Sequence, residues 1–118
     1  MTPKELQERT VQFAARVLKL ADALPRSVSG RTVANQIARS GCSVAANYRA
    51  ALRGKSRADF INKITIVLEE ADETGFWIEL TERMDLLPPK RLQALLDEAE
   101  QLTKIFNATR TTSRNHKS

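Results

Sequence analysis

Apolar residues recur at helical spacing in four segments of this chain, and turn-forming residues separate the segments. In the first segment, Leu6, Phe13, Val17, Leu20 and Leu24 lie three, four or seven positions apart, which places them on one face of a helix. No segment shows the apolar–polar alternation with a period of two that a half-buried strand requires. The pattern therefore predicts an all-α protein.

Helix-start and helix-stop signals give the expected boundaries. Thr2 and Glu5 have the spacing of a capping box, and Pro25 ends the first helix because the residue before a proline disfavours helical geometry. Gly41 lowers helix stability by about 1 kcal/mol relative to Ala, yet we expect the second helix to continue through it. The four helices are expected at about residues 3–24, 30–53, 57–87 and 89–109.

Short turns between amphipathic helices predict an antiparallel up-down-up-down four-helix bundle over residues 1–110. Residues 111–118 are basic and polar, and we expect a disordered tail. The third and longest helix carries Ile66 and Trp77 away from the centre of its apolar stripe. This is more apolar surface than one bundle covers, so it indicates a second packing surface and self-association.

The composition argues against most kinds of reactive site. The chain has one His and one Cys, which disfavours a metal site, a Ser-His triad and an internal disulfide. The acidic run Glu69, Glu70, Asp72 and Glu73 has no helical His to accompany it as a bundle metal site would. We therefore expect no metal, no cofactor, no small-molecule substrate and no enzymatic activity.

The apolar segments are also too short for a membrane protein. No run approaches the roughly 20 apolar residues of a membrane-spanning helix, and no apolar stretch follows a basic N-terminus as in a signal peptide. We expect a cytoplasmic protein without a membrane partner.

The net charge of +5 hides a stronger asymmetry along the chain. Residues 25–57 contain seven basic residues and no acidic one, whereas residues 58–82 contain seven acidic residues and only Lys63 as a base. These opposite charges suggest that the two segments pair with each other, either within one subunit or between subunits.

A specific pairing can be proposed for the second and third helices. Glu70, Glu73 and Trp77 share one helical face, and Arg39 or Arg49 is expected to meet Glu70 or Glu73 in a partly buried polar network. The network would fix register or subunit orientation rather than add much stability. It is one alternative; the other is a pair of solvated charged faces.

Three further side chains belong to these expectations. Asn47 can share the Arg39 face, and Trp77 packs either at a subunit contact or in the ordinary core. Cys42 is expected to be a buried and inert thiol among small residues.

Two basic clusters are candidate phosphate contacts, with plain solubilising charge as the alternative. The first surrounds the turn between the second and third helices and consists of Arg49, Arg53, Lys55 and Arg57. The second lies within residues 104–118, at the end of the fourth helix and beyond it, and consists of Lys104, Arg110, Arg114 and Lys117. Few aromatic residues are free to stack on bases, so contacts to the nucleic-acid backbone without sequence preference are expected.

Three stretches of the chain resemble a known family in order and spacing. They are QIARSGCSVAANYRAA at residues 36–51, RGKSRADFI at 53–61 and LEEADETGFWIEL at 68–80. They are similar to the four-helix-bundle protein family, also called the 23S rRNA intervening sequence protein family. The resemblance implies a four-helix bundle, ring-like homopentamers, and a distant relation to the accessory protein of diversity-generating retroelements, which binds a reverse transcriptase and nucleic acid. It implies no catalytic residues.

The sequence and the resemblance together lead to two expected functions. The first is a non-enzymatic structural or adaptor oligomer, a homopentamer whose surface binds a nucleic acid or a nucleic-acid enzyme. The alternative is a direct, sequence-tolerant binder of RNA or DNA that acts through its basic patches.

Overall fold

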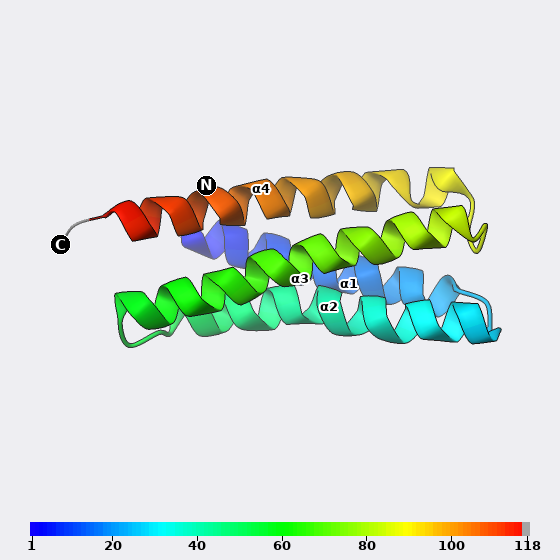
Figure 1. The fold of residues 1–118 in the computed structure, drawn as a ribbon, viewed down its shortest axis with the longest axis horizontal. Helices are drawn as coiled ribbons and strands as arrows, with labels where there is room; N and C mark the ends of the chain where they lie inside the picture. The colour runs from blue at the N-terminus through cyan, green and yellow to red at the C-terminus, as the bar shows by residue number, and fades with distance from the viewer. Residues whose placement is uncertain (117–118) are drawn as a thin grey trace.

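Four long helices run back and forth along one axis in the computed structural model, which describes residues 1–116 (Figure 1). They are α1 (Pro3–Ala23), α2 (Val28–Leu52), α3 (Arg57–Arg83) and α4 (Gln93–Asn115), and a 3-10 turn, η1 (Pro89–Arg91), precedes the last one. Residues 1–116 contain no strand. The predicted all-α, up-down-up-down bundle is confirmed.

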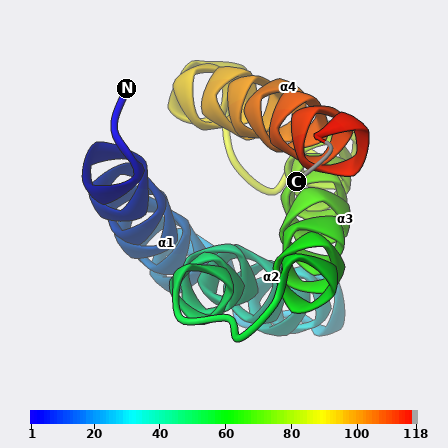
Figure 2. The same ribbon diagram turned by 90° about the vertical axis from the view of Figure 1, so that its left-hand side faces the viewer.

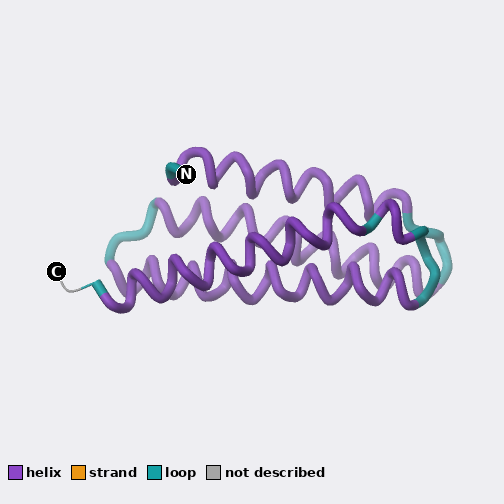
Figure 3. The backbone as a smooth tube through the Cα atoms, turned by 90° about the horizontal axis from the view of Figure 1, so that it is seen from above, coloured by secondary structure: helices purple, strands orange, loops and turns teal. Residues whose placement is uncertain are grey.

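The helices follow one another around the bundle axis. Seen from one end, α2 lies between α1 and α3, and α4 lies on the far side of α3 (Figure 2). The loops are short and sit only at the two ends of the rod (Figure 3). The molecule is 51 Å long and 20 Å across, so each helix spans most of its length.

The first three helices begin where side chains cap them. The Thr2 hydroxyl accepts a hydrogen bond from the Glu5 amide, and the Glu5 carboxylate accepts one from the Thr2 amide, which completes the expected capping box. These bonds from Thr2 also lower the pKa of Glu5. Ser27 caps α2 by accepting from the Gly30 amide, so α2 begins at Val28 rather than at residue 30.

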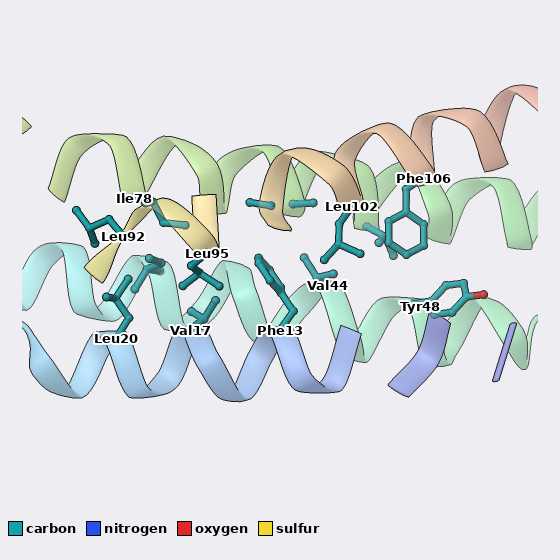
Figure 4. Close-up of a cluster of buried hydrophobic side chains, with 14 of the residues drawn as sticks. Phe13, Val17, Leu20, Val44, Tyr48, Ile78, Leu92, Leu95, Leu102 and Phe106 are labelled. Atoms are coloured by element: carbon teal, nitrogen blue, oxygen red, sulfur yellow. The ribbon is translucent and has the colours of Figure 1, made fainter. Parts of the chain in front are cut away.

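The core is built from the apolar stripes of all the helices (Figure 4). Phe13 and Val17 of α1 face Val44 of α2, and all three are buried. Tyr48 and Phe106 close one end of the core with an edge-to-face contact whose ring centroids are 5.1 Å apart.

The second helix continues through its glycine, as expected. A side chain at Gly41 would place a Cβ only 2.6 Å from the Cγ1 atom of Val17. The glycine therefore lowers the intrinsic helix propensity of α2 but allows α1 to approach closely.

The start of α4 and the ends of α3 and α4 also differ from the sequence expectation. α4 begins at Gln93 rather than at residue 89, because residues 89–91 form the 3-10 turn η1 instead. α3 ends at Arg83 rather than at residue 87 because Asp85 adopts a positive φ of 54°. The Leu86 amide then bonds the Thr81 carbonyl, and the Asp85 amide bonds the Glu82 carbonyl, as in a Schellman motif.

The expectation of a disordered tail from residue 111 is wrong for residues 111–115, which continue α4 to Asn115. Residues 107–115 contain no Gly or Pro that would stop a helix, and the buried Phe106 fixes the preceding turn to the core. Lys117 lies outside the described residues.

Candidate interaction surfaces

A polar network joins α2 to α3 at the surface. Arg39 Nη1 donates to Glu70 Oε2 over 2.8 Å, and its Nη2 donates to Glu73 Oε2. Trp77 Nε1 donates to the same Glu73 oxygen over 3.1 Å. The hydrogen bond with Glu70 raises the pKa of the Arg39 guanidinium. We call Arg39, Glu70, Glu73 and Trp77 the α2–α3 polar network.

The network lies partly open to solvent. The side chain of Arg39 is 49% exposed, whereas that of Glu70 is 16% exposed. Directly beneath, the fully buried hydroxyl groups of Ser40 and Thr74 are hydrogen-bonded, 2.8 Å apart. Polar atoms therefore extend from the surface into the α2–α3 interface, where a satisfied pair can fix the register of two helices.

Two other residues of the predicted network lie elsewhere. Asn47 donates to the carbonyl and hydroxyl oxygens of Ser43, within α2. Arg49 is exposed and makes no ion pair within residues 1–116. The structure thus joins Arg39, and not Arg49, to the two carboxylates.

A second charged contact, not predicted from the sequence, links α1 to α4. The Arg9 guanidinium donates to both carboxylate oxygens of Glu98 over 2.7 Å and to Gln101 over 3.0 Å. The hydrogen bond with Glu98 raises the pKa of Arg9. The partners are 89 positions apart, so only the packed bundle shows that they meet.

An apolar groove runs between α3 and α4. Its volume is about 310 Å³; Ala71, Gly75 and Ala99 are among the small residues that line it, and Phe76 lies at its edge. Phe76 is 52% exposed and packs its ring edge-to-face against Trp77, with centroids 4.9 Å apart. We call this the α3–α4 groove.

Phe76 is not among the surface residues predicted from the sequence. Its position is out of phase with the buried stripe of α3, and that mismatch was the available signal. Three carboxylates and one ammonium group also line the groove, and they belong to Asp72, Glu79, Glu100 and Lys104.

Other apolar side chains of α3 are also exposed. Ile66 is 38% exposed and Met84, which follows the helix, is 49% exposed. Of the two residues expected to form the excess apolar surface, Ile66 is exposed, whereas Trp77 is half-buried against the core; the most exposed large apolar side chain of the helix is Phe76 instead.

The first basic cluster and one residue of the second, Arg114, lie at the same end of the rod. The turn between α2 and α3 and the last residues of α4 lie at the same end, on the left in Figure 1. Arg53, Lys55, Arg57 and Arg114 are exposed there. We call these four residues, together with Arg49, the basic end.

Two members of the second cluster do not behave as tail residues. Lys104 lies in the α3–α4 groove. Arg110 is half-buried, and its Nε atom is buried without a hydrogen-bond partner within residues 1–116. Arg114 is thus the exposed member that the structure places at the basic end.

Comparison with known proteins identifies the family. The model of the 23S rRNA-intervening sequence protein family matches residues 4–108. The chain belongs to this family. A similar solved structure, with a TM-score of 0.86, is a protein of unknown function from the S23 ribosomal protein family of Bacteroides thetaiotaomicron. The two chains are 32% identical, and the alignment covers 94% of this chain and 99% of the other. No curated protein matches the chain.

The remaining features of this member of the 23S rRNA-intervening sequence protein family concern ligands and membranes. Within residues 1–116, no three His, Cys, Asp or Glu side chains form a group that could hold a metal ion. No helix in the same range combines the length and apolar character needed to cross a bilayer.

Cys42, expected to be buried, is instead half-buried because it lies toward the outer side of α2.

Proposed function

We propose that this family member is a non-enzymatic, self-assembling bundle that serves as a structural or adaptor oligomer. The observation that carries the proposal is Phe76, an aromatic side chain 52% exposed beside the apolar α3–α4 groove. A large apolar side chain next to a groove is typical of a surface that packs against another protein. Five copies is the number that the family resemblance implies.

The energetics favour burial of this surface. Removing a Phe side chain from water is worth about 1.5–3 kcal/mol, and aromatic residues often dominate the binding energy of an interface. Ile66 and Met84 add apolar area along the same helix and the turn that follows it. In a cyclic oligomer, every copy repeats the same partner-binding surface, which raises avidity for an extended partner.

Self-association can be measured directly on the full chain. Sedimentation velocity and light scattering between low and high micromolar concentration are expected to give a mass several times the 13.2 kDa of one chain. A mass that stays at one chain throughout this range would overturn the proposal. Affinity capture from the native host would then identify the partner of the oligomer.

A second candidate function is contact with nucleic acid. The supporting observation is that Arg114 lies at the same end of the rod as the first basic cluster, although about 57 to 65 positions separate them in the sequence. A concentrated basic surface attracts the phosphate backbone without reading its sequence. The bound species would be an RNA or a DNA, alone or together with an enzyme that acts on it.

This function predicts a steep salt dependence that comes from the basic end. Anisotropy titrations with labelled single-stranded RNA and DNA are expected to show that affinity falls with salt, with a log–log slope of about −0.7 for each phosphate contacted. The double variant R57E/R114E, which changes two exposed members of the basic end, should lose most of the binding. The matched control R26E/R31E changes the same charges near the opposite end, at the turn between α1 and α2, and should bind nearly as well as the unmodified chain. Equal losses in both variants, or no binding at low salt, would contradict this function.

A further inference from the structure

The opposite charges of α2 and α3 are only partly satisfied within one chain. Among residues 1–116, the ion pairs between these helices are those of Arg39 with Glu70 and Glu73. Asp72 and Glu79 instead line the α3–α4 groove. The sequence pattern allowed the charges to pair within one subunit or between subunits. The carboxylates of Asp72 and Glu79, which make no ion pair within residues 1–116, are placed to pair with a second subunit.

The outer face of α2 has the complementary character. Helical spacing places two rows there, one with Asn35, Cys42 and Arg49 and one with Arg39, Ala46 and Arg53. The middle of this face is small and the following turn is basic, and residues 25–57 contain no carboxylate. We call these two rows the α2 outer face.

The α3–α4 groove is complementary to the α2 outer face in shape and in charge. Phe76 projects at its edge, where a protruding ring can pack against the small side chains of Cys42 and Ala46. The groove carries three carboxylates and one ammonium group. Its net charge is therefore opposite to that of Arg49 and Arg53, the two arginines of the α2 outer face that make no ion pair within residues 1–116. Complementary charge of this kind fixes the register of an interface and excludes the like-charged alternative.

We propose that the α3–α4 groove of one copy receives the α2 outer face of a second copy. The inference rests on the self-assembly proposed above and specifies which two surfaces meet. Because the two surfaces belong to different helices, the contact is heterologous, and each copy has one groove and one face to offer. Repetition of such a contact closes into a ring when the rotation permits and otherwise forms a filament.

Two variants separate the two surfaces. Phe76→Gln removes the ring from the groove but keeps the α2 outer face intact, and Ala46→Glu places a carboxylate on that face but leaves the groove intact. Gln and Glu are both good helix formers, so both variants should fold, and circular dichroism with thermal melting checks this. Leu18→Gln is the matched control, because Leu18 is a 43% exposed apolar residue on α1, outside both surfaces.

Each variant alone is expected to be a single chain in sedimentation velocity at concentrations where the unmodified protein and Leu18→Gln assemble. Each should raise the apparent dissociation constant by about tenfold or more, as loss of a central interface residue does. An equimolar mixture of the two variants should form a dimer with one copy of each. The intact groove of one then holds the intact face of the other.

The outcomes also distinguish this inference from the proposed function. If the unmodified chain assembles but Phe76→Gln or Ala46→Glu assembles equally well, the proposed function stands and this interface is wrong. The interface is also wrong if each variant dissociates but their mixture gives no dimer, or if Leu18→Gln dissociates to the same extent. If the unmodified chain is a single subunit at every concentration, self-assembly itself fails.

Discussion

Gly41 shows how one missing side chain sets the distance between two helices. A Cβ at this position would lie 2.6 Å from Val17 Cγ1, whereas a Cβ at Gly75 would make only ordinary contacts of 3.9 Å with Ala99 and Leu96. Val17 is buried and β-branched, so it has little freedom to move away. The close approach of α1 therefore requires glycine at position 41, whereas packing does not require it at position 75.

These two glycines give opposite predictions. Gly41→Ala should lower the free energy of unfolding by about 1–2 kcal/mol, because overpacking outweighs the gain in helix propensity. Gly75→Ala should raise it by up to about 1 kcal/mol, because only the gain remains. Urea unfolding in the Phe76→Gln background keeps self-association out of the measurement. Val17→Ala should relieve most of the cost of Gly41→Ala; if it does not, the contact with Val17 is not the cause.

Tyr48 makes the bundle sensitive to high pH. Burial raises the pKa of Tyr48 above its ordinary value of 10.0, so the folded chain holds the phenol proton more tightly than the unfolded chain does. This contribution to stability is fully present below pH 10.0 and is lost as the pH rises through the raised pKa. The melting temperature should therefore fall above that pH more steeply for the unmodified chain than for Tyr48→Phe.

The titration can be read without interference, because Tyr48 is the only tyrosine of the chain. The ultraviolet absorbance of ionised tyrosine should rise at a higher pH in the folded protein than in urea. Superimposable titrations in the two states, or parallel melting curves for the two proteins, would contradict this account.

Asp85 determines where the helix α3 ends. It adopts a φ of 54°, a conformation that costs most L-residues about 1–2 kcal/mol and Asp somewhat less. Asp85→Gly should raise the free energy of unfolding by about 0.5–1 kcal/mol, after allowing for the greater entropy of glycine in the unfolded chain. Asp85→Ala should lower it by a similar amount. Chemical denaturation measures both, and the same sign for both variants would rule out the φ of residue 85 as the cause.

The α2–α3 polar network is the second feature that acts between elements. Arg39→Met leaves Glu70 and Glu73 without their cation, but the half-exposed position limits the loss of stability to about 1 kcal/mol. The fluorescence of Trp77, the only tryptophan, should change because its indole N–H donates to Glu73. Arg39→Lys keeps the positive charge but not the planar guanidinium group. Its Trp77 fluorescence should therefore lie between those of Arg39→Met and the unmodified chain.

The network was also expected to fix subunit orientation, and the same variant tests this. Sedimentation of Arg39→Met should show altered assembly. If the mass in solution, the melting temperature and the fluorescence all match those of the unmodified chain, the charges are simply solvated.

At the scale of the whole molecule, folding and assembly should be coupled. An interface that forms only between folded chains stabilises them by mass action, so the melting temperature should rise with protein concentration. The Phe76→Gln variant should melt at a temperature that does not depend on concentration. Calorimetry at several concentrations makes the comparison, and concentration-independent melting of the unmodified chain would show that the subunits do not associate when they fold.

The architecture and the core could be predicted because their signals are local. The 3.6-residue period of the helix places Phe13, Val17 and Val44 on the buried faces of their helices. A capping box such as that of Thr2 and Glu5 depends on residues only three positions apart. The end of α3 was missed because Asp85 occupies a position that usually requires glycine.

The surfaces depend on how the helices are rotated and shifted against one another, which local spacing does not specify. The periodicity indicated that Arg39 could meet Glu70, but only the packed bundle determined that Arg39 and not Arg49 does so. The Arg9–Glu98 contact, the position of Arg114 at the same end as the first basic cluster and the groove beside Phe76 likewise arise between different helices. Helix formation is decided over a few neighbouring residues, whereas a surface is decided by the relative placement of whole helices.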